Sequence, residues 1–240
     1  MIKKIIIKLL PQKLRQKLRH YAPQKLRRYI KTYKILSLDF GHWNSFKKKI
    51  PVDANNNPIP WYTYPAIEYL KQFDFSEKSI FEWGGGYSSL FWSERAREVV
   101  SVDNNREWVD EIEKQKKNNN LNLIYAEKKD AYLSSISRQN KKFNVIINDG
   151  EYRFDCAKIA KRYLKDNGLV ILDNSDWFPN SAKTLRDSGL LQVDFSGFGP
   201  FNNYTWTTSL FFGSNFNFKT TKNRQPVHSI GSRKNYAKES

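Results

Sequence analysis

Acidic side chains stand at or just beyond the ends of several apolar segments of this sequence. They are Glu82, Asp103, Asp130, Asp149 and Asp173. An acid at such a half-buried position costs free energy unless a partner or a ligand meets it. In an open parallel sheet, ligands bind beyond the carboxyl ends of the strands, so these acids would gather at one edge. Asp also caps helices and turns, which explains each residue alone, but their recurrence favours a ligand site.

Three consecutive glycines follow the first acid, in the segment Glu82-Trp83-Gly84-Gly85-Gly86-Tyr87-Ser88-Ser89. Glycines let a ligand approach the backbone, and the helix expected next offers free N–H groups. A dinucleotide fingerprint would have a further glycine at position 89 and would hold a pyrophosphate, whereas this chain has Ser89 and an acid. An acid suits S-adenosylmethionine, whose amino-acid end carries an ammonium and which has no phosphate. Asp103 lies 19 residues beyond Gly84, the spacing at which an acid meets ribose hydroxyls.

Short apolar strands and single helices alternate through the middle of the chain. Two further strands at the end of this region are joined by a loop alone, so they must pair antiparallel or splay. Strands separated by single helices pair in parallel through right-handed crossovers. The pattern predicts an α/β fold with a doubly wound, mostly parallel seven-stranded sheet. The strands are expected at 79–83, 99–102, 121–125, 143–147, 169–172, 191–195 and 206–212, and helices at 65–72, 88–97, 106–117, 131–137, 154–165 and 181–188.

The segment 82–89 resembles the first motif of class I S-adenosylmethionine-dependent methyltransferases, and Asp103 resembles their ribose-binding acid. The segment Pro60-Trp61-Tyr62-Thr63-Tyr64-Pro65, the pair Asp149-Gly150 and the run 171–174 are similar to a bacterial branch of that superfamily. The resemblance covers roughly residues 58–213 and implies a methyl donor without naming the acceptor. The cofactor-binding residues that it implies are Glu82, Gly84, Gly85, Gly86, Ser88, Asp103, Asp130 and Asp149.

Asp149, Asp173 and Asn174 offer three oxygen ligands after the fourth and fifth predicted strands. The set resembles the magnesium site of catechol-type O-methyltransferases, in which Mg²⁺ would lower the pKa of an acceptor hydroxyl. We therefore expect Asp149 and Asp173 to be catalytic, with Mg²⁺ as an optional second cofactor. In the alternative, these residues cap a turn and a loop. Arg153 stands near where the family usually has a further histidine or acid, which weakens the metal hypothesis; it would hold an anionic acceptor or pair with an acid.

Histidine and cysteine contribute little to the predicted site. His20, His42 and His228 lie outside the predicted sheet and its helices, so a histidine base requires the loop that carries His42 to fold over the site. Cys156 stands beside Ala157 on a predicted helix and is expected to be a small core residue rather than a nucleophile. A single cysteine also excludes a disulfide framework or a cysteine-rich zinc site within one chain.

The positive charge of the chain is concentrated in its first fifty residues. Residues 1–50 carry a net charge of +14 out of +17, so the remaining body is nearly neutral, unlike a nucleic-acid-binding domain. The element PQKLR occurs twice, and Leu14 with Leu18 and Leu26 with Ile30 are each four residues apart, which predicts short amphipathic helices after Pro11 and Pro23. Residues 1–36 would pack on the domain or bind an anionic membrane surface.

The combined prediction is an enzyme that methylates a small-molecule or glycan-type acceptor at oxygen. The alternatives are an RNA methyltransferase that grips RNA with the basic arm, and a non-catalytic partner protein that retains the fold. We expect a basic helical extension and loop at 1–57, the loop beginning at 37, then a catalytic domain at 58–218 and a loose polar tail at 219–240. Trp61, Tyr62 and Tyr64 would close over the pocket or pack at the sheet edge. No apolar run is long enough to span a bilayer, and we expect a cytoplasmic protein, peripheral at most to the inner face of the membrane.

Overall fold

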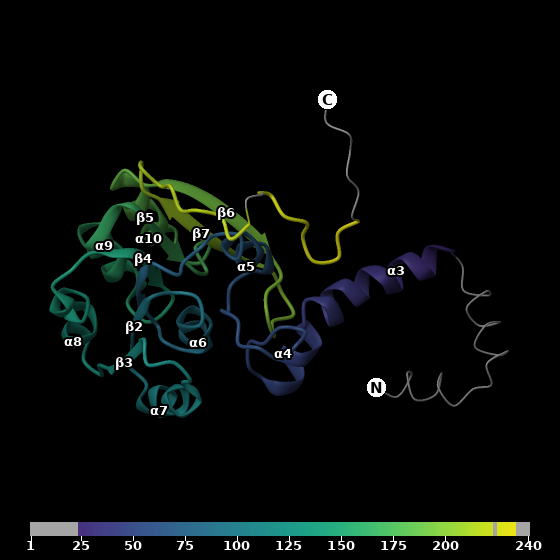
Figure 1. Ribbon diagram of the computed structural model, residues 1–240, viewed down its shortest axis with the longest axis horizontal. Helices are drawn as coiled ribbons and strands as arrows, with labels where there is room; N and C mark the ends of the chain where they lie inside the picture. The colour runs from purple at the N-terminus through teal and green to yellow at the C-terminus, as the bar shows by residue number, and fades with distance from the viewer. Residues whose placement is uncertain (1–23, 223–224, 234–240) are drawn as a thin grey trace.

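The computed structural model of the chain describes residues 24–222 and 225–233. Within these residues, seven strands form one sheet in the order β3-β2-β1-β4-β5-β7-β6 (Figure 1). β1 to β5 pair in parallel, whereas β7 is antiparallel to both of its neighbours. This is the predicted doubly wound, mostly parallel sheet. The strands are β1 (Ser79–Trp83), β2 (Glu98–Asp103), β3 (Leu121–Tyr125), β4 (Phe143–Asn148), β5 (Leu164–Leu172), β6 (Leu191–Gly197) and β7 (Trp206–Phe212).

Helices cover both faces of the sheet because successive residues of each strand point to opposite sides. On one face, Ile80 of β1 belongs to the core formed with helices α5, α6 and α7. On the other face, Phe81 and Trp83 belong to the core formed with α8, α9 and α10. The strand that carries the glycine loop is therefore buried along its whole length. The helices are α5 (Tyr64–Leu70), α6 (Tyr87–Ser93), α7 (Arg106–Gln115), α8 (Lys129–Ser134), α9 (Arg153–Tyr163) and α10 (Pro179–Asp187), with a short 3₁₀ turn, η2 (Ser137–Gln139).

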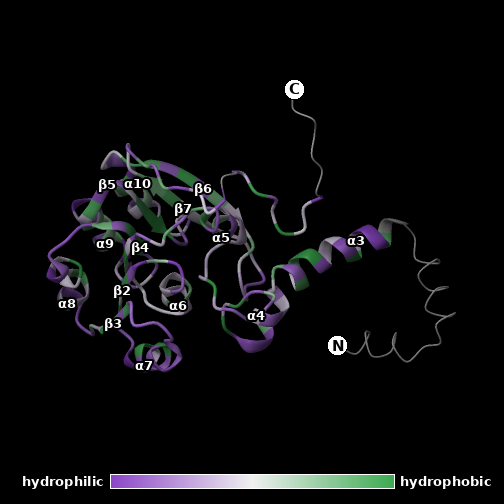
Figure 2. Cartoon of the chain, viewed as in Figure 1, coloured by the Kyte–Doolittle hydropathy of each residue, from purple (hydrophilic) through white to green (hydrophobic). Residues whose placement is uncertain are grey.

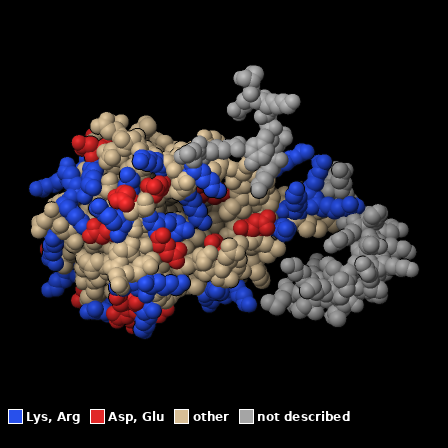
Figure 3. All heavy atoms as spheres, viewed as in Figure 1, with Lys and Arg blue, Asp and Glu red and all other residues tan. Residues whose placement is uncertain are grey.

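The described part of the basic extension begins with helix α3 (Gln24–Lys34) and continues through a π-helical turn, η1 (Ile35–Asp39). α3 projects from the body of the molecule, and hydrophobic residues are interspersed with hydrophilic ones along it (Figures 1 and 2). Lys and Arg side chains gather on it (Figure 3). The helix predicted after Pro23 is thus confirmed, whereas the helix predicted after Pro11 lies outside the described residues. None of the helices in the described ranges is long and apolar enough to cross a membrane.

The prediction of a loop from residue 37 to the catalytic domain is wrong in its first part, because helix α4 (His42–Lys48) forms there. Ser45 of α4 is buried; its hydroxyl donates to the carbonyl of Val52 at 2.7 Å and accepts from the Val52 N–H at 3.0 Å. Gly41 (φ +80°) permits this packing, since a Cβ there would lie 2.2 Å from the backbone of Asp53. Val52 and Ile59 are buried, so this segment packs against the sheet domain.

The described part of the polar tail is not loose, contrary to expectation. Thr220 forms an antiparallel bridge with Phe73, just after α5. The Val227 N–H then donates to Oε1 of Gln72 at 3.2 Å, and the Ile230 N–H donates to Glu68 of α5. Hydrogen bonds to α5 and the residues that follow it therefore hold this segment, which composition alone did not reveal. Residues 223–224 and 234–240 lie outside the described part of the chain.

Candidate active site

The carboxyl ends of the parallel strands surround a cavity of about 390 Å³. The loops after β1, β2, β4 and β5 form one part of its wall, and the loop between β6 and β7 forms another. This is the edge of the sheet where the strand-end acids predict a ligand site. The lining residues are Pro51, Trp61, Gly84, Gly85, Gly86, Tyr87, Ser88, Asp103, Trp108, Asp149, Gly150, Arg153, Asp173, Asn174, Trp177, Asn202, Tyr204 and Trp206.

Close backbone contacts hold the glycine loop between β1 and α6. Gly84 has a φ of +96°, and its N–H donates to the carbonyl of Val102 on β2 at 2.9 Å. A Cβ on Gly84 would lie 2.5 Å from the backbone nitrogen of Gly150, in the loop after β4. Only glycine tolerates both the backbone conformation and this approach, so the two loops fix each other's position at the cavity.

Glu82 lies behind the glycine loop and not in the cavity. Its side chain is fully buried, and its Oε2 atom accepts hydrogen bonds from the hydroxyls of Ser89 and Ser101. The Ser89 hydroxyl also accepts from the N–H of Gly86 at 2.9 Å, which connects the acid to the loop. Burial raises the pKa of Glu82 to about 7, and the serine hydrogen bonds oppose that rise. This placement corrects the expectation that Glu82 touches the cofactor, because its carboxyl shapes the loop from within the core.

Asp103 ends β2 at the cavity, where the sequence predicts a ribose-binding acid. Its Oδ1 atom accepts from the N–H of Asn105 at 2.8 Å, and burial raises its pKa against the effect of that hydrogen bond. Asn105 also caps α7 by accepting from the N–H of Trp108 at 3.0 Å. The Trp108 ring lines the cavity, and its Nε1 atom donates to the carbonyl of Gly85 at 2.6 Å. The helix cap therefore brings a tryptophan to the glycine loop.

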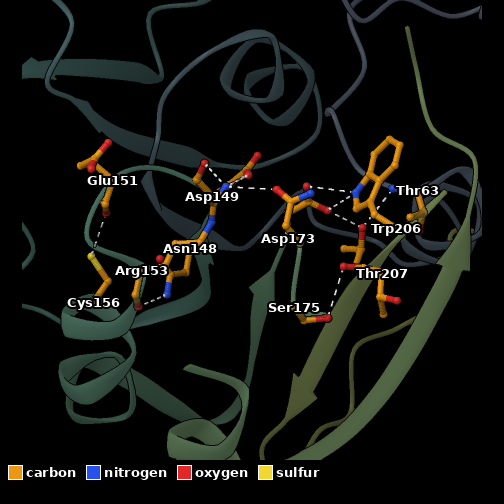
Figure 4. Close-up of polar contacts among 12 residues, drawn as sticks. Thr63, Asn148, Asp149, Glu151, Arg153, Cys156, Asp173, Ser175, Trp206 and Thr207 are labelled. Carbon is orange, nitrogen blue, oxygen red and sulfur yellow. Dashed lines mark hydrogen bonds and ion pairs between the residues drawn. The ribbon is translucent and has the colours of Figure 1, made fainter. Parts of the chain in front are cut away.

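Asp149 follows β4 and forms an ion pair with Arg153, with 2.7 Å between Oδ1 and Nη2 (Figure 4). The same nitrogen of Arg153 donates to the Asp149 carbonyl at 2.8 Å and to Oδ1 of Asn174 at 3.4 Å. The guanidinium also lies 4.6 Å from the ring centre of Phe178. Burial raises the pKa of Asp149, and the charge of Arg153 opposes that rise. Of the two roles that the sequence left open for Arg153, the structure shows pairing with an acid.

Asp173 follows β5 and lies between the Asp149–Arg153 pair and Trp206 (Figure 4). It is almost completely buried, and its Oδ1 atom accepts from the Trp206 ring N–H at 3.0 Å and from the Thr208 hydroxyl at 2.5 Å. Burial, reinforced by the charge of Asp149, raises the pKa of Asp173 well above its ordinary value. Two carboxyls thus stand side by side, one paired with a cation and one held by neutral donors.

The three residues predicted to bind Mg²⁺ do not form a set of free oxygen ligands. Arg153 occupies Asp149 and reaches Asn174, while Trp206 and Thr208 occupy Asp173. A guanidinium amid the oxygen donors would repel a divalent cation. In residues 24–222 and 225–233, no three His, Cys, Asp or Glu side chains are grouped so as to hold a metal ion. The arrangement does not fit the predicted magnesium site.

Other candidate residues lie away from the cavity. Asp130 is exposed in the first turn of α8 and does not line it, which corrects its place among the cofactor residues. Cys156 is buried in the core with a raised pKa, as expected for a packing residue. His42 contacts the carbonyl of Asn202, a lining residue, at 2.8 Å but does not line the cavity itself. His228 lies in the segment that follows the sheet, and His20 lies outside the described residues.

The aromatic segment before α5 divides between the cavity and the core. Trp61 lines the cavity, whereas Tyr62 and Tyr64 are buried and do not. The prediction of a closing cap thus applies to Trp61, and the alternative of ordinary packing applies to the two tyrosines. Tyr64 packs on Phe40, with 4.6 Å between the ring centres.

Sequence reasoning missed several aromatic residues of the wall. Trp177 follows Asp173-Asn174 by three residues, so the strand-end argument could have included it. Trp206 is the first residue of β7, and Tyr204 lies two residues before it in the loop. Because β7 is antiparallel to β5, its first residues lie at the same edge as the last residues of β5. Recognising that pairing would have placed them at the site.

No model of a protein family matches the sequence, and no curated protein matches it. Among solved structures, the chain is similar to precorrin-6y C5,15-methyltransferase from Geobacter metallireducens, with a TM-score of 0.52 and 14% identity over 62% of this chain and 87% of that one. The fibrillarin pre-rRNA processing protein of Methanococcus jannaschii has a TM-score of 0.49 and 16% identity over 62% and 74%. Precorrin 8w decarboxylase from Methanobacterium thermoautotrophicum has a TM-score of 0.48 and 15% identity over 69% and 97%. The first of these likenesses shows the fold, which is that of the class I methyltransferases.

Proposed function

We propose that this chain, which has the class I methyltransferase fold, transfers a methyl group from S-adenosylmethionine to an oxygen of a small-molecule or glycan-type acceptor. The observation that carries the proposal is the charge of the cavity around the glycine loop. Asp103 and Asp149 line it, and Arg153, the one cation among the described lining residues, is paired with Asp149, so Asp103 leaves a net negative charge there. A pyrophosphate would meet like charge there, whereas a sulfonium and an ammonium would meet opposite charge.

The loops after β1, β2 and β4 supply the groups that would hold the cofactor. Asp103 would accept hydrogen bonds from the ribose hydroxyls, as an acid at the end of the second strand does in related nucleotide sites. The glycine loop allows a ligand to lie against its backbone, and Ser88 and Trp108 border the same part of the cavity. Asp149, beside Gly150 and Gly84, would meet the ammonium group. These residues fit S-adenosylmethionine without any further ion.

The other part of the cavity has the character of an acceptor site. Trp61, Trp177, Tyr204 and Trp206 supply aromatic faces, and the rings of Trp177 and Tyr204 lie 6.0 Å apart. The side chain of Asn174 adds amide groups that can donate to and accept from hydroxyls. Apolar faces with a few placed polar groups are typical of small-ligand sites, and such faces stack on sugar rings as well as on aromatic ones.

The two adjacent carboxyls suggest how the acceptor hydroxyl is activated. S-adenosylmethionine supplies an electrophilic methyl group when it is bound. Arg153 stabilises Asp149 as an anion, whereas Asp173 faces mainly neutral donors and has a strongly raised pKa. Asp173 is therefore the better proton acceptor, because a base is most effective when its pKa approaches the working pH. Trp206 and Thr208 would hold its carboxylate in place while it takes the proton of the acceptor hydroxyl.

Titration calorimetry of the full chain with S-adenosylmethionine, with and without Mg²⁺, tests this proposal. We expect binding that Mg²⁺ leaves unchanged. Binding should weaken in Asp103→Ala and persist in Asp130→Ala, a matched control in which an acid outside the cavity is removed. If the unaltered chain bound NAD and not S-adenosylmethionine, the cavity would belong to a dinucleotide and the proposed function would be refuted. The cytoplasmic location expected from the sequence remains part of this proposal.

A further inference from the structure

Helix α3 carries an apolar face that no described part of the chain covers. Leu26, Tyr29, Ile30 and Tyr33 lie within about 100° of arc on one side of the helix. Their exposed fractions are 49%, 73%, 58% and 76%, in the order given. The opposite side carries lysines and arginines. Such exposed and segregated faces usually mark a contact surface, because apolar side chains gain nothing from water. Arg28 and Lys31 lie opposite the apolar face, whereas Arg27 and Lys34 lie beside one of its edges.

A second exposed apolar group begins on α4, the helix that follows η1, and extends to the cavity. Trp43 and Phe46 of α4 stack with 6.2 Å between their ring centres and are about half exposed. Phe46 lies 6.2 Å from Phe201 in the loop between β6 and β7, and Phe201 lies 5.4 Å from Trp61, which lines the cavity. We call these four residues the aromatic ridge. Three exposed lysines, 47–49, adjoin it at the end of α4.

We propose that the apolar face of α3 and the aromatic ridge form one surface that docks on an anionic membrane, with the mouth of the cavity turned toward the bilayer. Leucine and isoleucine would enter the boundary of the acyl chains. Tyrosine and tryptophan favour the level of the lipid head groups, where one part of the ring is apolar and the other is wet. Lysine and arginine on the same elements would contact anionic head groups. This inference does not depend on methyl transfer.

Charge distinguishes a membrane from the other candidate occupants of this surface. Residues 24–50 contain eight lysines and arginines and one acid, Asp39, and residues 1–23 add seven more basic residues and no acid. A second copy of the chain docked through the same face would bring two such segments together, and like charges would oppose the contact. RNA would satisfy the charge but would leave Leu26 and Ile30 in water, because phosphate and sugar offer no apolar layer. An anionic bilayer offers both a negatively charged surface and an apolar layer.

Vesicle sedimentation with the full chain tests the docking. Phosphatidylcholine vesicles with and without phosphatidylglycerol are compared with a single-stranded RNA oligonucleotide. We expect binding to the anionic vesicles, and about tenfold weaker binding when two apolar side chains are removed in Leu26→Ser/Ile30→Ser. Leu191→Ser is the matched control, since Leu191 is 68% exposed at the opposite end of the sheet from the cavity. Unchanged vesicle binding by the double variant, or preference for RNA over anionic vesicles, overturns the proposal.

A second pair of variants tests the orientation of the cavity. Trp43→Ala/Phe46→Ala removes half of the aromatic ridge and should also weaken vesicle binding by about tenfold. Phe154→Ala, which removes a 43%-exposed ring on α9, should leave it unchanged. If the ridge variant binds vesicles as the unaltered chain does while the α3 variant does not, the cavity does not face the bilayer. Calorimetry with S-adenosylmethionine on the same variants distinguishes a failure of docking from a failure of the proposed function.

Discussion

Replacing Glu82 with Gln should make the protein more stable at neutral and alkaline pH. Glu82 is fully buried behind the glycine loop, and burial raises its pKa from 4.5 to about 7. Its Oε1 atom has no hydrogen-bond partner among the described residues, so the anion is incompletely solvated by the protein. Gln has nearly the shape of a protonated Glu and still offers an acceptor to Ser89 and Ser101. It removes the ionisation while preserving the loop.

The expected size of the effect follows from the two pKa values. A folded-state pKa that is raised above the unfolded value favours folding at low pH, and this advantage is lost as the pH rises through the folded pKa. Ionising Glu82 in the folded chain therefore costs up to about 3 kcal/mol. The free energy of unfolding of Glu82→Gln, minus that of the unaltered chain, should rise by about 2.5 kcal/mol between about pH 5 and about pH 8.

Urea unfolding of both proteins at several pH values measures this difference. The difference between the proteins is more informative than either curve, because Asp149 and Asp173 titrate in both and largely cancel. Ser89→Ala serves as a comparison, since it removes one hydrogen-bond donor to the Glu82 carboxylate. Its free energy of unfolding should depend more steeply on pH than that of the unaltered chain. If the free energy of unfolding of Glu82→Gln minus that of the unaltered chain stayed flat or fell with rising pH, the ionised carboxylate would be stable in the folded core. The claim that burial raises the pKa of Glu82 would then be refuted.

Four further outcomes follow from the cavity. Asp103→Ala should weaken S-adenosylmethionine binding about ten- to hundredfold in calorimetry, because it removes a charged hydrogen-bond acceptor. Asp173→Asn should lower the rate of methyl transfer about a hundredfold or more with little change in cofactor affinity. In the unaltered chain, the rate of methyl transfer should rise with pH as Asp173 ionises. Arg153→Met should lower the free energy of unfolding by about 3 kcal/mol, because Asp149 is left largely buried and unpaired. A second change, Asp149→Asn, should restore much of that loss in a double-mutant cycle. Removal of divalent cations with EDTA should change neither the melting temperature nor cofactor affinity; a fall in either would restore the metal hypothesis.

The sequence predicts the sheet well because strand burial and helix spacing are local properties. β1 is buried along its length and Glu82 is its one charged residue. The acids recur where strands end, so the edge that holds the cavity follows from the rule for parallel sheets. Segments of mixed polarity are harder to predict. α4 contains His42, Trp43 and two lysines at its end. Only its packing through Ser45 onto Val52 explains why it is a helix within a predicted loop.

The role of Glu82 shows where pattern reasoning fails. An acid two residues before a glycine loop suggests direct contact with a ligand, but direct contact requires the side chain to face the cavity. Glu82 lies on a strand between two other strands, and its pairing with Ser101 of β2 and Ile147 of β4 places it in the interior. Ser89, which stands where a dinucleotide fingerprint has glycine, then supplies the hydroxyl that connects the acid to Gly86. The departure from the fingerprint and the buried acid therefore explain each other.

Asp149 and Asp173 lead to a related conclusion about catalysis. Both follow a parallel strand and both end in a carboxyl group, so the sequence treats them alike and offers a shared metal as the reason for their proximity. The structure gives them different partners: Arg153 is four residues after Asp149, while Trp206 and Thr208 come from an antiparallel strand more than thirty residues after Asp173. A cation beside one carboxyl and neutral donors beside the other separate their affinities for a proton, which is what acid–base chemistry requires. Because β7 pairs with β5, the two carboxyls are not equivalent metal ligands, and under the proposed function Asp149 acts as an anion and Asp173 as the base.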